Sequence, residues 1–154
     1  MSLVHDRHMR RAIQVARENE KAPFGALIVD ATTGDEVATG CNCSDNDPTL
    51  HGEIDCIRKA AAVWDPGRCG DYVLYTTAEP CPMCMSACVW GGFRAVVYGT
   101  SIPYLQATGW FQIDIRSHEV AAKGGWGPDR VVGGVMEAEC DRLFDAAMRL
   151  HRGG

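Results

Sequence analysis

Apolar residues recur every three or four positions in two stretches, one near each end of the chain, and this spacing predicts an amphipathic helix in each. Residues 5–19 place Met9 and Ile13 on one side, opposite a row of arginines. In residues 137–151 the positions expected to face inward are Leu143, Phe144, Ala147 and Leu150. We therefore expect both ends of the chain to pack as helices against the elements between them.

Between these helices, short β-prone runs alternate with further helical stretches. The β-prone runs are rich in β-branched and aromatic residues and are bounded by turn residues. They cover residues 23–30, 37–42, 72–77, 94–100 and 130–135. The helical stretches cover residues 50–64, 82–90, 104–108 and 117–123. This order of elements predicts one three-layer α/β domain over residues 1–154.

Local signals add detail at four places. The turn "TTGDE" joins the first two β-prone runs, which predicts a hairpin. About thirty residues separate the last two strands, enough for a helical crossover, so these strands are expected to run parallel. Thr49 is expected to cap the helix over residues 50–64. Pro82 is expected to open the helix over residues 82–90, where its missing N–H costs nothing.

Composition and charge narrow the class of protein. With 46% hydrophobic and 23% charged residues in 154 positions, the chain resembles one globular domain with a buried core. No run approaches the roughly 18 apolar residues of a membrane span, and residues 1–11 lack a signal-peptide core, so we expect a cytoplasmic protein. A net charge of -5 argues against a nucleic-acid partner. We interpret Arg142, Arg149 and Arg152 as a solvated helix face.

The eight cysteines are interpreted as free thiols and metal ligands, because no secretion signal accompanies them. Cys81 and Cys84 differ from the others because they lie three residues apart at a predicted helix start. The N–H groups and the helix dipole there favour a thiolate. His51 lies at the start of another predicted helix, so two helix N-termini can converge on one metal. Two thiolates and one imidazole suit a catalytic zinc site that leaves its fourth position to water.

Glu53 follows His51 by two residues and points to another side of the helix, so it suits a proton carrier better than a ligand. A competing site would combine Cys41 and Cys43 with the same thiol pair as a structural four-thiolate centre. That arrangement would close the coordination sphere and leave the imidazole and the carboxylate without a role. The three-ligand site is therefore preferred, and the role of Cys41 and Cys43 stays open.

The segment His51-x-Glu53, followed by Pro80-Cys81-x-x-Cys84, resembles the H-x-E…P-C-x-x-C signature of zinc nucleobase deaminases. On these residues the chain is identified as a member of the cytidine-deaminase-like superfamily over nearly its full length. Further matches are "PFGA" at 23–26, Asn42, "NDPT" at 46–49 and Trp90 after the thiol pair. The resemblance implies an α/β/α sandwich on a five-stranded mixed sheet, with a cytidine-deaminase-like fold, and a homodimer or larger assembly.

The resemblance also implies the chemistry. One zinc ion per chain, held by His51, Cys81 and Cys84, would activate water, and zinc-bound hydroxide would displace an exocyclic amino group as ammonia. Glu53 would carry protons from the water to the ring nitrogen and the leaving amine. The implied substrate is a small nucleobase, nucleoside or related aminated heterocycle.

Several side chains are candidates for contact with that substrate. Asn42 is the expected polar contact, by resemblance to an asparagine that the family keeps after its second strand. Phe24 and Trp90 are candidates for lining the site or stacking on the base, with ordinary core packing as the alternative. Asp114 and Glu119 lie in an irregular segment where related deaminases keep selectivity residues, with plain solvation as the alternative.

Within the superfamily, the matches favour a guanine-type base. The guanine branch keeps a selectivity carboxylate that aligns with residues 101–109, where this chain has none and Tyr104 stands near the expected place. Leaving N–H donors of guanine unpaired would cost binding free energy, so a related heterocycle stays open as the substrate. Cytosine also stays open, because "LHGEI" at 50–54 resembles small cytosine deaminases. The acidic charge weighs against tRNA adenosine. A catalytically silent, zinc-stabilised scaffold would need the thiol pair but not Glu53.

Overall fold

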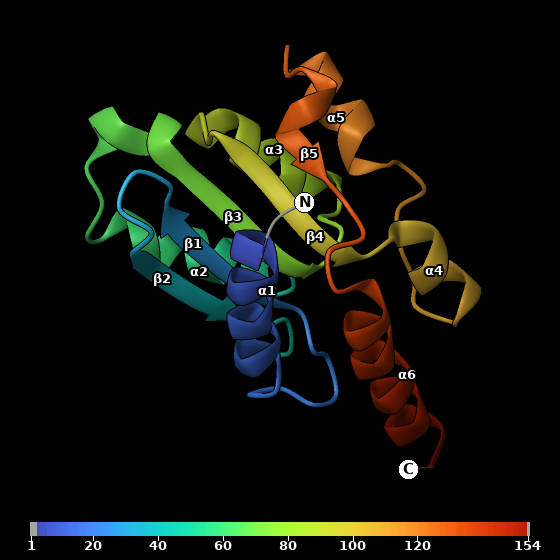
Figure 1. The fold of residues 1–154 in the computed structure, drawn as a ribbon. Helices are drawn as coiled ribbons and strands as arrows, with labels where there is room; N and C mark the ends of the chain where they lie inside the picture. Colours follow the sequence, from blue (N-terminus) through green and yellow to red (C-terminus); the bar gives the residue numbers. More distant parts are fainter. Residues whose placement is uncertain (1–2, 154) are drawn as a thin grey trace.

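A five-stranded mixed sheet forms the middle layer of the computed structural model, which describes residues 3–153 (Figure 1). Its strands are β1 Gly25–Asp30, β2 Glu36–Cys41, β3 Tyr72–Ala78, β4 Ala95–Thr100 and β5 Val131–Val132. They lie in the order β2-β1-β3-β4-β5. β1 is antiparallel to both of its neighbours, and β3, β4 and β5 are parallel to one another. The predicted hairpin and the parallel last pair are therefore confirmed.

Helices cover both faces of the sheet. They are α1 Leu3–Ala16, α2 Gly52–Ala61, α3 Pro82–Gly91, α4 Ile102–Ala107, α5 Ser117–Lys123 and α6 Glu137–Gly153, with short 3-10 helices at Pro66–Asp71 and Pro128–Arg130. α1 and α6 pack on one face, and α2, α3 and α5 pack on the other (Figure 1). This arrangement is the expected α/β/α sandwich. Within residues 3–153, no helix combines the length and apolar character needed to cross a membrane.

Alternating side chains of the strands build two cores, one on each face of the sheet. Leu74 and Val96 pack with α2, α3 and α5. Their sequence neighbours Val73 and Val97 pack with α1 and α6. β3 is buried along its whole length, because it is a central strand with helices on both faces. A continuous apolar run, rather than an alternating one, is the pattern typical of such a strand.

The last strand is shorter than its sequence predicts. β5 holds 2 residues, whereas the β-prone run covers residues 130–135. Gly133 lies so close to the ring of Tyr98 that an added Cβ would be 2.4 Å from it, and Gly134 adopts a φ of 77°. This glycine pair turns the chain out of the sheet towards α6, so pairing ends early.

The predicted cap of α2 is wrong. His51, not Thr49, occupies the N-cap position, with φ -67° and ψ 163°. The N–H and the hydroxyl of Thr49 both donate to Oδ1 of Asp47, at 2.9 and 2.7 Å. The preceding turn therefore uses the group that was expected to cap the helix. The imidazole at the N-cap makes no capping hydrogen bond and stays available for another partner.

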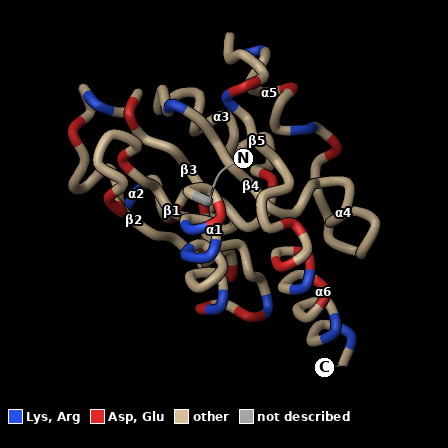
Figure 2. Tube along the Cα trace, viewed as in Figure 1, with Lys and Arg blue, Asp and Glu red and all other residues tan. Residues whose placement is uncertain are grey.

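The outer side of α6 mixes acidic and basic positions (Figure 2). Arg142, Arg149 and Arg152 are exposed there, as expected for a solvated helix face. Leu150 is 50% exposed, although the periodicity placed it inward. It lies near the end of the helix, which extends beyond the sheet (Figure 1), so little of the core is left for it to cover.

α2 lies directly against β2 because a glycine lets the two backbones meet. A Cβ added to Gly40 would be 2.3 Å from the backbone nitrogen of Cys56 and 2.4 Å from the backbone oxygen of Gly52. Backbone atoms of a packed helix cannot yield as a flexible side chain can. The contact therefore sets where α2 begins, and with it the placement of His51 and Glu53.

We expect Gly40→Ala to lower the free energy of unfolding by about 1–3 kcal/mol, because the added methyl group overlaps backbone atoms on α2. Gly70→Ala is the matched control, since nothing lies within 4 Å of a Cβ added there. Urea denaturation of both variants measures the difference. An unfolding midpoint of Gly40→Ala equal to that of the unmodified chain would contradict this close approach.

Candidate metal centre and active site

Cys81 and Cys84 reach the site from the start of α3. The chain leaves β3 through Glu79 and Pro80, and Cys81 then occupies the N-cap of α3, with φ -63° and ψ 168°. Pro82 takes the first helical position, as the sequence predicts. Cys84, one turn further on, is buried, and its spacing places it on the same side of the helix.

His51 approaches these thiols from the start of α2. Its Nδ1 lies 3.6 Å from Sγ of Cys81 and 3.6 Å from Sγ of Cys84. The three ligand atoms all lie within 4.8 Å of one another. The two helix N-termini thus converge, as their sequence pattern predicts.

The donor set fits a zinc ion. Zinc binds imidazole nitrogen at about 2.0–2.1 Å and thiolate sulfur at about 2.3 Å, in a tetrahedral arrangement. Those bond lengths place nitrogen and sulfur about 3.6 Å apart. The two nitrogen–sulfur separations observed here are 3.6 Å. Within residues 3–153, His51, Cys81 and Cys84 form the one group found that could supply three such ligands.

Cys41 and Cys43 are not part of this group. The Cys41 thiol points to the carbonyl oxygen of Ala16 at 3.9 Å, and the Cys43 thiol donates to the carbonyl oxygen of Cys41 at 3.4 Å. Burial raises the pKa of Cys41 to about 11, which keeps it a thiol. The competing four-thiolate site is therefore not built by this fold.

The local electrostatics favour a thiolate at Cys81. A hydrogen bond from Cys84 and a further one with His51 lower the pKa of Cys81 to about 4. The free N–H groups at the start of α3 act in the same direction. The interaction with Cys81 also raises the pKa of His51. A thiolate at this position is the form that binds a metal.

Glu53 lies in the first turn of α2, beside the three ligands but outside their group. The residue is 3% exposed, and the hydroxyl of Thr76 in β3 donates to its Oε1 at 2.9 Å. Burial raises the pKa of Glu53, which favours the protonated form. A buried carboxyl that can hold a proton beside a metal suits the predicted proton carrier.

A cavity of about 470 Å³ opens beside the ligands, a size typical of small-molecule sites. His51, Glu53 and Cys81 are among the residues that line it. The other lining residues are Ala22, Phe24, Asn42, Ser44, Pro48, Glu79, Met83, Trp110, Phe111, Gln112 and Ile113. A larger groove of about 670 Å³ lies between α1 and α6. It contains none of the metal ligands, so the smaller cavity is the candidate site.

Asn42 and Phe24, two of the predicted substrate contacts, line this cavity. The Nδ2 of Asn42 donates to the hydroxyl of Ser44 at 2.8 Å, which leaves the side-chain oxygen as an acceptor. Phe24 packs edge-on against Trp110, with ring centroids 5.4 Å apart. Phe24 therefore combines a place in the aromatic packing with a place in the cavity wall.

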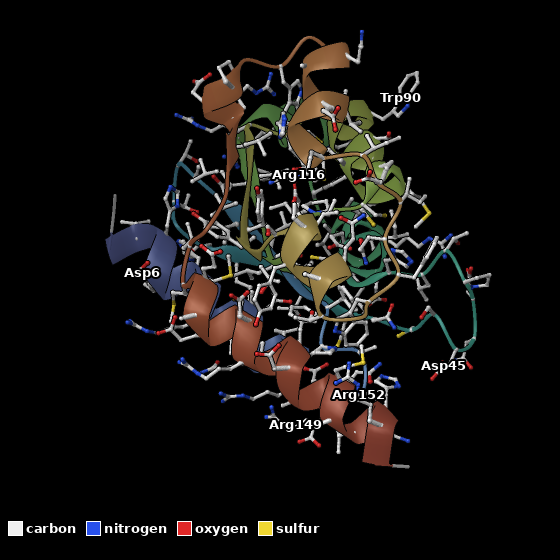
Figure 3. All side chains as sticks on the ribbon, turned by 90° about the vertical axis from the view of Figure 1, so that its right-hand side faces the viewer. Asp6, Asp45, Trp90, Arg116, Arg149 and Arg152 are labelled. Carbon is white, nitrogen blue, oxygen red and sulfur yellow. The ribbon has the colours of Figure 1, made fainter. Side chains whose placement is uncertain are left out.

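Four further predicted contacts lie outside the cavity lining. Glu119 accepts from the N–H of Arg116 at 2.7 Å, at the start of α5. Trp90 is at the far end of α3 from the thiols, is 90% exposed, and projects away from the molecule (Figure 3). Tyr104 donates to a carboxylate oxygen of Asp145 in α6 at 2.9 Å. Asp114 accepts a hydrogen bond from Gln106 at 3.3 Å. The structure therefore does not support a contact between these side chains and a base bound in the same chain.

The residues at 110–113 form a cavity wall that the sequence patterns did not identify. They follow α4 in the irregular segment. Gln112 brings an amide to the wall. Trp110 has a buried indole Nε1 for which no partner is found, and its ring packs among aromatic rings. The run "GWFQI" mixes aromatic side chains with an amide, but no spacing rule connects it to the metal ligands.

Comparisons with known proteins point to one family. The model of the cytidine and deoxycytidylate deaminase zinc-binding region matches residues 3–100. Guanine deaminase of Bacillus subtilis (strain 168) is 42% identical over 100 residues, 61% of this chain and 63% of that protein. tRNA(Ile)-lysidine synthase of Deinococcus radiodurans is 36% identical over 133 residues, 85% of this chain and 22% of that protein. This chain thus spans less than two thirds of either relative.

A solved structure supports the same fold. Guanine deaminase from Nitrosomonas europaea superposes with a TM-score of 0.79, covering 94% of this chain and 84% of that chain, at 24% sequence identity. At this identity the likeness concerns the fold. It confirms the predicted deaminase-like fold. The zinc-binding family match and the three-ligand group confirm the predicted zinc site at His51, Cys81 and Cys84.

We expect Cys84→Ala to lower zinc affinity by more than about 100-fold. Removing a residue that only hydrogen-bonds to a metal ligand already costs up to about 100-fold, and Cys84 is itself a ligand. Cys88→Ala is the matched control, because Cys88 is a buried cysteine one turn further along α3 and outside the ligand group. Elemental analysis of both purified variants measures zinc per chain. Full zinc content in Cys84→Ala would contradict the three-ligand site.

Proposed function

The chain belongs to the cytidine and deoxycytidylate deaminase zinc-binding family, and from that premise we propose that it is a zinc-dependent hydrolase releasing ammonia from a small free nucleobase. The observation that carries this proposal is the buried carboxyl of Glu53 beside a three-ligand site that opens into a cavity. When bound, zinc supplies the Lewis acidity that makes water nucleophilic near neutral pH. Three protein ligands leave room for that chemistry, whereas a closed structural site would not.

Glu53 moves the protons. Its Oε1 accepts from the hydroxyl of Thr76, which orients the carboxyl in the lining of the cavity. From there it can take a proton from the attacking water, pass it to a ring nitrogen, and help to protonate the leaving amine. The raised pKa of Glu53 suits a group that must both accept and release a proton.

A guanine-type base is the substrate that we propose. The cavity offers amides at Asn42 and Gln112 and an aromatic side chain at Phe24, which suits a flat polar ring. The similarity to the Bacillus subtilis guanine deaminase supports the same choice.

Cytosine is the second candidate, because the cavity wall lacks an acceptor carboxylate that is free for the base. Its carboxylates are Glu53 and Glu79, and Arg116 occupies Glu79. The N–H groups of guanine would have to donate hydrogen bonds to amide oxygens instead of a carboxylate. Cytosine presents fewer such donors once its amino group has reacted, so it depends less on a carboxylate.

An ammonia-release assay across guanine, cytosine, adenine, their nucleosides, pterins, aminotriazines and tRNA tests this proposal. We expect the highest kcat/KM with free guanine. Highest activity with cytosine would favour the second candidate, and activity on tRNA would contradict a small-molecule substrate. No ammonia from any of these with zinc-replete protein would refute the hydrolase and favour a zinc-stabilised scaffold.

We expect Glu53→Gln to keep its zinc and to lower kcat by about 100- to 10,000-fold, the usual contribution of a general acid–base. Glu36→Gln is the control, because Glu36 pairs with Arg11 at the surface, where its side chain is 42% exposed. Ammonia release and zinc content are measured on both variants. Undiminished turnover of Glu53→Gln would contradict the proton-carrier role.

We also propose that residues 1–154 act as one cytoplasmic domain and that this domain forms a homodimer, as the family resemblance implies for the assembly. Support comes from apolar side chains that the single chain leaves exposed, Trp90 at 90%, Phe111 at 87% and Ile113 at 50%, since such groups often mark contact surfaces. Light scattering coupled to gel filtration should give twice the chain mass of 16.7 kDa. A monomer at micromolar concentration would contradict the proposal.

A further inference from the structure

Glu79 is a buried carboxylate to which the proposed reaction assigns no role. It lies between β3 and the ligand Cys81, and its side chain is 0% exposed. All the partners found for its oxygens are donors, and they come from three residues. They are the N–H of Ile102 at 2.7 Å, the N–H and hydroxyl of Ser117 at 3.2 and 2.9 Å, and Nε of Arg116 at 2.9 and 3.0 Å.

These donors mark the two ends of one segment. Ile102 is the first residue of α4, and Ser117 is the first residue of α5. Arg116, labelled in Figure 3, is the N-cap residue of α5. The chain between them contains the cavity wall at residues 110–113. One carboxylate therefore holds both ends of the stretch that closes the cavity.

Glu79 is itself fixed to the sheet at the metal end. Its N–H donates to the carbonyl oxygen of Thr100 in β4 at 2.7 Å, and only Pro80 separates it from Cys81. Arg116 also donates to the hydroxyl of Tyr98 in β4 at 3.3 Å. Moving the wall would break buried, charge-assisted hydrogen bonds, which are stronger than neutral ones. The position of the wall relative to the metal ligands therefore depends on this carboxylate.

We propose that Glu79 is a positioning residue for substrate selection. By holding residues 102–117 in place, it sets the distance between Gln112 and the metal ligands. A base whose edge fits that distance is bound, and a base of another size loses its hydrogen bonds to the wall. This inference rests on the proposed deaminase function. The hydrogen bonds from Ile102, Arg116 and Ser117 to Glu79, here called the clamp, are a property of the fold. Its effect is on binding and discrimination, not on proton transfer by Glu53.

Glu79→Gln is the direct test. The variant keeps the size of the side chain, but its NH2 group must face a donor, because every partner of Glu79 donates. We expect KM for guanine to rise about tenfold or more, as for a misplaced wall. We expect kcat to stay within about threefold, with zinc content unchanged. The ratio of kcat/KM for guanine to that for cytosine should shrink.

A fall in kcat at constant KM, or a loss of zinc, would overturn the proposal. Glu79 would then support the ligand loop instead, that is, residues 79–81 between β3 and α3, which carry the ligand Cys81. Asp30→Asn is the matched control. Asp30 is also a buried carboxylate, 6% exposed. It accepts from Thr32 and, at 2.7 Å, from Arg68. It pairs with the first residue of β3, so it lies at the opposite edge of the sheet. If KM rose equally in Asp30→Asn, the rise in Glu79→Gln would reflect lost stability rather than a displaced wall, and the proposal would be refuted.

Hydrogen exchange measures the clamp without any substrate. In zinc-loaded Glu79→Gln, amides of residues 103–115 should exchange faster, and those of β3 should not change. Ser117→Ala removes one donor and should give a smaller rise in the same peptides and in KM, which preserves the test if Glu79→Gln does not fold. Unchanged exchange in these variants would overturn the clamp. If exchange is faster in the variants but the unmodified chain deaminates no base, the clamp is supported and only the proposed deaminase function is refuted.

Discussion

The convergence of two helix N-termini on one point is the constraint on which the site depends. β1 is antiparallel to both β2 and β3, so β2 and β3 run in the same direction. Their carboxyl ends therefore meet at one edge of the sheet, and α2 and α3 begin beyond that edge. The contact of Gly40 with α2 and the proline that opens α3 complete the alignment. As a result, His51 and Cys81 are both N-cap residues of facing helices.

The same edge holds two buried carboxylates whose surroundings give them different roles. Glu53 accepts from the hydroxyl of Thr76 and from the thiol of Cys84, and burial raises its pKa. Glu79 is surrounded by donors from Ile102, Ser117 and the ion-paired Arg116. A carboxylate paired with a cation and several N–H donors holds structure together, whereas a carboxyl whose pKa is raised by burial can take up and release a proton. Environment, rather than residue type, separates the two.

The metal centre and the cavity wall that we propose for substrate selection come from different parts of the chain. The zinc ligands and Glu53 lie within the residues that match the family model, 3–100. The wall at residues 110–113 lies beyond that match, between α4 and α5. A family can keep its reaction while its substrate changes if the wall varies and the metal centre does not. The buried clamp at Glu79 joins these parts, because it lies next to the ligand loop and binds both ends of the wall segment.

The sequence alone determined the elements with strong periodicity and the groups whose chemistry depends on short spacing. The helix–strand order, the hairpin, the thiol pair at Cys81 and Cys84, and the pairing of His51 with Glu53 are all local patterns, and local patterns are readable from neighbouring residues. The length of β5 does not follow from a local pattern, because it depends on the contact between Gly133 and Tyr98. Only the tertiary structure decided the cavity wall at residues 110–113 and the exposed position of Trp90. Those outcomes depend on contacts between segments far apart in the chain, and an irregular loop carries no period that records where it will pack.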